Sequence, residues 1–227
     1  MLGHEALAFD VYGTLVDPIR ISKRLEHHLT DAALRVAEVW RQKQLEFTFR
    51  LTAMERYEDF QQVTRRALDY ALAAAGRDLQ PSEKAELIAQ YDDLEPFPDV
   101  EPGLRSLQAA GYAMVVFSNG SPAMLDALID NADLRGYFRG IVSVDDVRAF
   151  KPSPKVYRLV ADRLGRPLPE IRLISSNAFD VIGAQAAGMQ AAWVDRSGGL
   201  FDTLGPRPQI VVGALTELAD ALAAGRG

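Results

Sequence analysis

The sequence predicts an α/β protein, with a doubly wound parallel sheet and an inserted helical subdomain. Two observations predict this fold. Short apolar runs alternate with helix-period segments along most of the 227 residues, which is the pattern of strands buried in a parallel sheet between crossover helices. In addition, a long helix-period stretch without a convincing strand follows the first apolar run.

Each strand is predicted from a short apolar run bounded by polar or turn residues. The six runs are residues 6–9, 113–117, 140–144, 171–174, 190–194 and 209–212. Helical patterns lie between the later runs, at about 103–110, 121–131, 153–164, 178–187 and 214–224. Two of these helices have a proline in the first turn, after Ser121 and Ser153, a position that suits proline.

Residues 17–98 are predicted to form a cap, inserted into a core made of residues 1–16 and 99–227. Helical patterns in the insert cover roughly 30–52, 57–75 and 82–92. The chain then returns through residues 95–103, where three prolines favour an extended connector. A lid over the sheet is the natural interpretation, and the alternative is that these helices simply extend the core.

Composition excludes several classes of protein. The absence of cysteine removes disulfides, thiol nucleophiles and thiolate metal sites. A net charge of −6 disfavours nucleic acid and anionic membranes as partners, and no apolar run approaches the ~20 residues of a membrane span. The start, Met1 to Glu5, lacks the features of a signal peptide, so a cytoplasmic location is expected.

Polar side chains follow four of the predicted strands. Asp10 follows the first strand, Ser118 and Asn119 the second, Lys151 the third, and residues 175–180 the fourth. Ligands of open α/β sheets bind beyond the carboxyl ends of the strands. Each residue taken singly is explained as well by a turn or a helix cap, but together they predict an active site.

These motifs resemble the haloacid dehalogenase superfamily over the whole chain. The resemblance is carried by the segment Phe9-Asp10-Val-Tyr-Gly-Thr14-Leu, by Ser118-Asn119 after a hydrophobic strand, and by Lys151-Pro152. It implies that Asp10 is a nucleophile. Phosphatases of the superfamily carry a second Asp two residues later and a pair of acids after strand four, whereas this chain has Tyr12 and Ser176 there and keeps only Asp180.

The missing acids can be explained by the leaving group. Phosphoryl transfer needs a cation to neutralise phosphate oxygens and benefits from a proton donor. Halide leaves without either, and protein cations can hold a substrate carboxylate. The run Ser175-Ser-Asn-Ala-Phe-Asp180, with Trp40-Arg-Gln-Lys-Gln-Leu-Glu-Phe-Thr48, is similar to the L-2-haloacid dehalogenases in particular.

The resemblance implies attack by Asp10 on C2 of a short L-2-haloalkanoate, inversion, and hydrolysis of the resulting ester to a 2-hydroxy acid, with no cofactor or metal. Asp180 is the candidate base for the water, helped by Asn177 and Lys151. The resemblance also implies that the substrate carboxylate is bound by Ser118, Lys151 and Tyr12, and that the halide is bound by Arg41, Asn119 and Phe179. It implies that Thr14 and Ser175 position Asp10, and that Tyr157 makes a supporting contact to Asp180.

Several alternatives stay open at this stage. Arg41 fits a solvated surface position as well as an active site, and Tyr12, Leu45 and Phe60 fit the core of the lid as well as a pocket wall. A magnesium-dependent phosphatase of the same superfamily and a non-catalytic carboxylate-binding protein are the competing functions. A homodimer is expected from the resemblance, with the helix at about 30–52 packing against either a second subunit or its own lid.

Overall fold

A computed structural model describes residues 5–225, so His4 and most of the segment used above to argue against a signal peptide lie outside the described residues. The sheet has six parallel strands in the order β3-β2-β1-β4-β5-β6. The strands are β1 (Ala6–Phe9), β2 (Ala113–Ser118), β3 (Ile141–Ser143), β4 (Ile171–Ser175), β5 (Gln190–Val194) and β6 (Ile210–Val212). The doubly wound parallel sheet is therefore confirmed.

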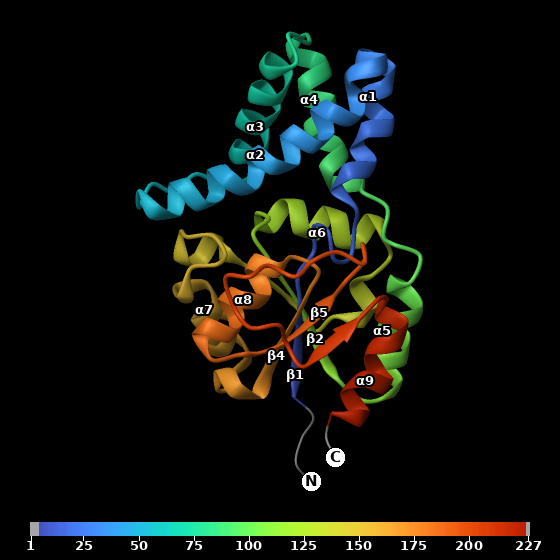
Figure 1. The fold of residues 1–227 in the computed structure, drawn as a ribbon, viewed down its shortest axis with the longest axis vertical. Coiled ribbons are helices and arrows are strands. Elements are labelled where there is room, and N and C mark those ends of the chain that lie inside the picture. Colours follow the sequence, from blue (N-terminus) through green and yellow to red (C-terminus); the bar gives the residue numbers. More distant parts are fainter. Residues whose placement is uncertain (1–4, 226–227) are drawn as a thin grey trace.

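The core helices cover both faces of this sheet. Helices α7 (Pro154–Leu164) and α8 (Ala178–Ala187) lie on one face, while α5 (Val100–Ala109) and α9 (Leu218–Ala224) lie on the other (Figure 1). Helix α6 (Pro122–Asn131) connects β2 to β3. Every residue of the central strand β1 is buried, as expected for a strand with helices on both sides.

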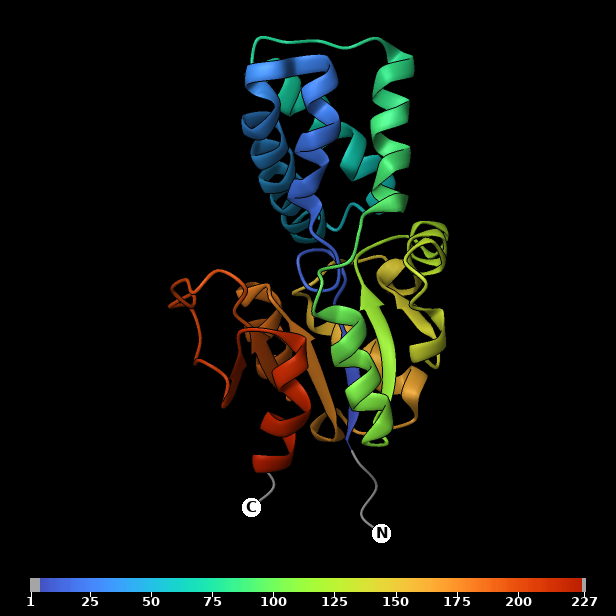
Figure 2. The same cartoon turned by 90° about the vertical axis from the view of Figure 1, so that its right-hand side faces the viewer.

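Four helices between β1 and β2 stand over the carboxyl edge of the sheet (Figures 1 and 2). They are α1 (Ser22–Leu29), α2 (Ala33–Ala53), α3 (Phe60–Ala74) and α4 (Pro81–Ala89). The last three match the predicted helices, but α1 was not predicted. Only Leu25 and Leu29 of α1 are buried, and two apolar positions in eight residues are too few to reveal a helical period.

The two connectors between these helices and the sheet run side by side. The backbone N–H of Phe97 donates to the carbonyl of Leu15 at 2.9 Å, and Pro96 forms a bridge with Val16. The prediction of an extended connector through residue 103 is wrong in its second half, because α5 already begins at Val100. Pro102 lies in the first turn of α5, where its missing N–H leaves no helical bond unmade.

Within residues 5–225, no helix combines the length and apolar character needed to cross a membrane.

Candidate active site

The predicted site residues converge at the carboxyl edge of the sheet, beneath the inserted helices. They surround a small cavity to which the core and helices α2 and α3 both contribute. Its lining residues are Asp10, Tyr12, Arg41, Leu45, Phe60, Ser118, Asn119, Lys151, Asn177 and Phe179. Thr14, Ser175 and Asp180 do not line the cavity but contact residues that do, and Tyr157 contacts Asp180.

The two oxygens of the Asp10 carboxylate have different surroundings. Oδ2 accepts hydrogen bonds from the Thr14 hydroxyl at 3.0 Å, the Ser175 hydroxyl at 3.3 Å and the Asn177 amide at 2.7 Å. Oδ1 accepts only from the ammonium of Lys151, at 3.2 Å, within the described residues. Asp10 is therefore held firmly through one oxygen, while the other has the greater freedom to react.

Lys151 links Asp10 to the second acid of the site. Its Nζ lies 2.8 Å from Asp180 Oδ2 and 2.8 Å from the carbonyl oxygen of Phe117, in addition to Asp10. Burial lowers the pKa of Lys151, but the charges of Asp10 and Asp180 outweigh burial and the net shift is upward. All three ammonium protons thus have protein acceptors, which favours the predicted role of Lys151 beside the aspartates over direct contact with a substrate carboxylate.

Asp180 is completely buried and is held from two sides. The Tyr157 hydroxyl donates to Asp180 Oδ1 at 2.8 Å, opposite the Lys151 contact. Burial raises the pKa of Asp180 to about 6, an effect that Lys151 opposes and the nearby charge of Asp10 reinforces. Burial likewise raises the pKa of Tyr157, so its hydroxyl stays protonated and donates.

Arg41 reaches the site from helix α2, so the structure rules out the alternative of a solvated surface position. Its Nη1 donates to Gln44 Oε1 at 2.9 Å, and its Nη2 donates to the backbone carbonyl of Tyr12 at 3.2 Å. Burial lowers the pKa of Arg41, but a guanidinium keeps its proton at neutral pH. The cavity therefore has a cation on the cap side, facing the acids of the core.

Aromatic side chains form the apolar wall of the cavity. The Tyr12 and Phe60 rings are 5.3 Å apart between centroids, and Phe49 of α2 packs edge-on against Phe179 at 5.1 Å. Tyr12 and Phe60 line the cavity and are almost fully buried. They therefore belong both to the pocket wall and to the packed core of the lid. The Tyr12 hydroxyl is buried with no hydrogen-bond partner among residues 5–225.

Ser118 and Asn119 keep donors directed at the cavity. The Ser118 Oγ accepts from the backbone N–H of Gly120 at 3.2 Å, and its own proton has no acceptor among residues 5–225. Asn119 Oδ1 accepts from the backbone N–H of Lys151 at 2.9 Å, so its oxygen is fixed and its amide group is oriented. Both residues are buried and can donate to an anion.

Sequence reasoning missed three residues that support the site. Gln44 and Thr64 hold Arg41 in place through consecutive hydrogen bonds. Gly183 lets Tyr157 approach α8, because a Cβ at this position would lie 2.5 Å from the Tyr157 hydroxyl. Gln44 was detectable, since it follows Arg41 by three residues and such pairs meet on one helix face. Thr64 and Gly183 act through contacts that no local pattern reveals.

A buried carboxylate after the central strand of a doubly wound sheet, under a helical cap, defines a class of capped α/β hydrolases. A family model described as haloacid dehalogenase-like hydrolase matches residues 4–188. The (S)-2-haloacid dehalogenase of Pseudomonas sp. (strain YL) is 36% identical over 95% of this chain and 93% of its own length. That of Xanthobacter autotrophicus is 41% identical over 85% of this chain and 75% of its own.

Solved structures agree with these sequence relatives. The L-2-haloacid dehalogenase from Xanthobacter autotrophicus, with chloropropionic acid covalently bound, superposes with a TM-score of 0.92 at 36% identity, covering 99% of this chain and 100% of that one. The chain belongs to the haloacid dehalogenase-like hydrolases and, among them, to the family of the (S)-2-haloacid dehalogenases.

Proposed function

We propose that this protein hydrolyses short-chain L-2-haloalkanoates to 2-hydroxy acids, with inversion at C2 and through an ester on Asp10, without a metal ion. The observation that carries the proposal is the asymmetry of the Asp10 carboxylate, with three donors on Oδ2 and a single ammonium contact on Oδ1. The covalently bound chloropropionic acid of the Xanthobacter relative supports a covalent route.

In the first step Oδ1 of Asp10 attacks C2 and halide leaves. The three donors on Oδ2 fix the carboxylate so that Oδ1 faces the cavity, which reduces the entropy lost on reaching the reactive geometry. Ser118 can donate to the substrate carboxylate, while Arg41, Asn119 and the edge of Phe179 surround the halide. The aromatic wall keeps water from the carboxylate before it attacks.

In the second step water attacks the ester carbonyl of Asp10. The negative charge of the tetrahedral intermediate then develops on Oδ2, where the hydroxyls of Thr14 and Ser175 and the amide of Asn177 already donate. Donors placed in advance around a developing oxyanion contribute strongly to catalysis. Asp180 accepts the proton of the water, with Tyr157 holding its other oxygen. When the intermediate collapses, the bond between Cγ and Oδ1 of Asp10 breaks, and the 2-hydroxy acid leaves with Oδ1 after its alkoxide takes up this proton. The Asp10 carboxylate is thereby restored with one oxygen from water.

Lys151 supports the metal-independent form of the reaction. Its ammonium occupies the space between Asp10 and Asp180, 3.2 Å and 2.8 Å from their oxygens. The ammonium of Lys151 thus supplies the positive charge that a bound metal ion would otherwise provide. The alternative of a magnesium-dependent phosphatase is not favoured, since the relatives that match most of the chain are dehalogenases.

A single turnover in heavy-oxygen water, with enzyme in excess over 2-chloropropionate, tests the proposal. The label is expected in the Asp10 side chain, because water attacks the enzyme carbonyl. Direct attack of water on C2 would place the label only in the product and would exclude the ester. Halide release should be unchanged by a chelator, and dependence on a divalent ion would restore the phosphatase alternative.

Three further expectations stand as proposals. We assign residues 17–98 to the cap and residues 1–16 and 99–227 to the core, since the paired connectors at Val16 and Pro96 mark the junction. The net charge of −6 supports a protein that binds no nucleic acid. A cytoplasmic location fits the absence of cysteine, which is typical of proteins that use no disulfides.

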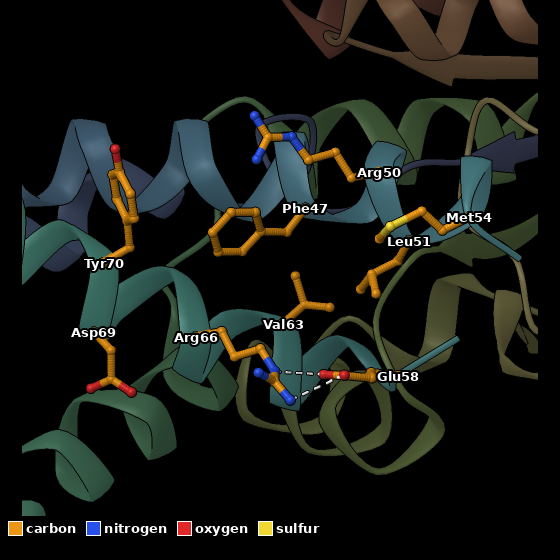
Figure 3. Close-up of a pocket in the computed structure, with 9 residues that line it drawn as sticks. All are labelled: Phe47, Arg50, Leu51, Met54, Glu58, Val63, Arg66, Asp69 and Tyr70. Carbon is orange, nitrogen blue, oxygen red and sulfur yellow. Dashed lines mark hydrogen bonds and ion pairs between the residues drawn. The ribbon is translucent and has the colours of Figure 1, made fainter. Parts of the chain in front are cut away.

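The proposed homodimer has a candidate surface on the cap. An apolar groove runs between α2 and α3, with Phe47, Leu51 and Val63 along its floor (Figure 3). Tyr70 and Met54 are exposed beside it, at 46% and 57%. The rim carries both signs of charge, including the ion pair of Arg66 with Glu58 at 2.6 Å. A rim of mixed charge can complement its own copy across a two-fold axis.

The dimer is tested by sedimentation at several protein concentrations. The wild type is expected at twice the monomer mass, and Leu51→Glu is expected to shift it towards the monomer because a carboxylate would be buried in the interface. Leu34→Glu, at an exposed site on the same helix outside the groove, is the matched control. A wild type that sediments as a monomer at all concentrations would contradict the proposal.

A further inference from the structure

Gln44 is a buried amide that the proposed mechanism does not use. Its side chain on helix α2 has no exposed surface, and it does not line the active-site cavity. A buried amide is unfavourable unless its donors and acceptor are satisfied. The partners of Gln44 therefore indicate what it does.

The hydrogen bonds that join Thr64, Gln44 and Arg41 have one direction only. Gln44 also interacts with the Tyr91 hydroxyl, which opposes the rise in the pKa of Tyr91 caused by burial. The Thr64 hydroxyl donates its single proton to the carbonyl of Phe60 at 2.7 Å. Thr64 Oγ1 can then only accept from Gln44, whose Nε2 lies 2.8 Å away. Since the amide nitrogen faces Thr64, the amide oxygen must face the other way, towards Arg41 Nη1 at 2.9 Å. Thr64 thus fixes which end of Gln44 meets the guanidinium.

The acceptors that hold Arg41 are both neutral. They are the amide oxygen of Gln44 and the backbone carbonyl of Tyr12, and within residues 5–225 Arg41 forms no ion pair with a carboxylate. Lys151 differs, because its charge is shared between Asp10 and Asp180. Arg41 therefore has no carboxylate in direct contact, although the more distant charges of Asp10 and Asp17 oppose the lowering of its pKa by burial.

We propose that Gln44, oriented by Thr64, is a positioning residue that aims Arg41 into the cavity while leaving its charge free for the departing halide. This inference rests on the proposed dehalogenation and on the place of Arg41 beside the halide. Neutrality at residue 44 is the essential property. A carboxylate there would hold the guanidinium equally well but would neutralise it.

The test compares Gln44→Glu with Gln42→Glu. The two changes are chemically identical and lie on the same helix, but Gln42 is exposed. Halide release in a single turnover of 2-chloropropionate, the rate of ester hydrolysis and the inhibition constant for added chloride are measured for both. Gln44→Glu is expected to slow halide release about 10- to 100-fold and to weaken chloride inhibition similarly, as for the loss of one charge-assisted contact. Ester hydrolysis should change less than about twofold, because Asp180 and the donors on Asp10 are untouched.

A purely structural role of Gln44 would affect halide release and ester hydrolysis alike. The decisive result is therefore slower halide release with little change in ester hydrolysis. If Gln44→Glu releases halide and binds chloride as Gln42→Glu does, the inference is wrong. If Gln44→Glu does not fold, Thr64→Val is used in its place. This change frees the Gln44 amide to flip and should slow halide release relative to ester hydrolysis. Equal effects on the two steps would refute the proposal. A wild type that releases no halide would instead refute the proposed function.

Discussion

Asp180 is the residue whose protonation decides whether the proposed ester can be hydrolysed. Burial raises its pKa to about 6, although Lys151 lies beside it. Below that pH the carboxyl is protonated and cannot accept a proton from water. The rate of ester hydrolysis should therefore rise as pH increases through about 6 and then level off. Asp180→Asn should accumulate the ester and lose this pH dependence.

The measurement is a rapid-quench time course with mass analysis of the Asp10 peptide between pH 5 and 8. Halide release before hydrolysis serves as the internal control, because it does not require a base. If Asp180→Asn turns over with the same pH profile as the wild type, a group other than Asp180 activates the water.

Gly183 determines how closely Tyr157 approaches Asp180. A Cβ at residue 183 would lie 2.5 Å from both the Tyr157 hydroxyl and Pro152 Cβ, so Gly183→Ala must displace one of them. Overpacking of this kind destabilises proteins by about 1–3 kcal/mol. We also expect ester hydrolysis to slow by about tenfold, the equivalent of one lost hydrogen bond to a charged group.

Thermal unfolding and single-turnover hydrolysis of Gly183→Ala provide the measurement. Gly136→Ala is the control, because a Cβ there meets nothing within 4 Å. Unchanged hydrolysis in Gly183→Ala would show that the Tyr157 contact does not matter for the reaction.

At the scale of elements, we expect contacts between the region at the end of α2 and residues 145–150 to control the position of the cap. Thr52 Oγ1 accepts from the backbone N–H of Phe150 at 3.0 Å, and the Tyr57 hydroxyl donates to Asp145. The Tyr57 ring also packs on Phe150, 5.0 Å away. The end of α2 lies away from the two connectors in Figure 1, so these contacts hold the opposite end of the cap.

Tyr57→Phe should weaken substrate binding more than it slows chemistry. The change removes the hydroxyl and keeps the ring, and one such hydrogen bond stabilises by about 1 kcal/mol. KM should therefore rise about three- to tenfold while the halide burst at saturating substrate keeps its rate. Tyr137→Phe removes a comparable hydroxyl–carboxylate contact, to Glu101 at 2.6 Å, within the core. A KM for Tyr57→Phe equal to that of Tyr137→Phe would contradict a role in closing the cap.

The elements were predictable from sequence to different degrees. Buried parallel strands produce compact apolar runs, so all six strands were found within one or two residues. The polar helix α1 was missed, because its fold depends on packing against its neighbours and its own pattern is weak. The start of α5 was misplaced, because proline in a first turn and proline in an extended connector look alike in sequence.

The site residues divide in the same way. Residues at or shortly after the ends of strands could be predicted because the sheet brings strand ends together. Asp10 and Asn119 directly follow β1 and β2, and Asp180 lies in the first turn of the helix after β4. Residues on the cap, such as Arg41, were assigned only through the family resemblance. Gln44, Thr64 and Gly183 were missed because their importance depends on distances between elements, which only the fold determines.

At the scale of the whole molecule, the small size of the cavity leads us to expect that the cap moves. The volume enclosed by Asp10, Arg41 and their neighbours is about 10 Å³, which is room for roughly one water molecule. A haloalkanoate is larger than this space, so we expect the substrate to enter while the cap is raised, and the two connectors at Val16 and Pro96 are where a hinge would act.

Spin labels on the cap and the core can follow this motion, because the chain has no cysteine of its own to compete. Labels at Ala73→Cys and Lys155→Cys, both exposed, should give a broad distance distribution in the free protein. The distribution should narrow once Asp180→Asn traps the ester, since contacts from both sides of the cavity then hold the cap closed. Labels at Arg139→Cys and Lys155→Cys, both in the core, should give one narrow distribution in either state. If the cap-to-core distribution is equally narrow before and after the ester forms, the substrate must enter by a route that leaves the cap in place.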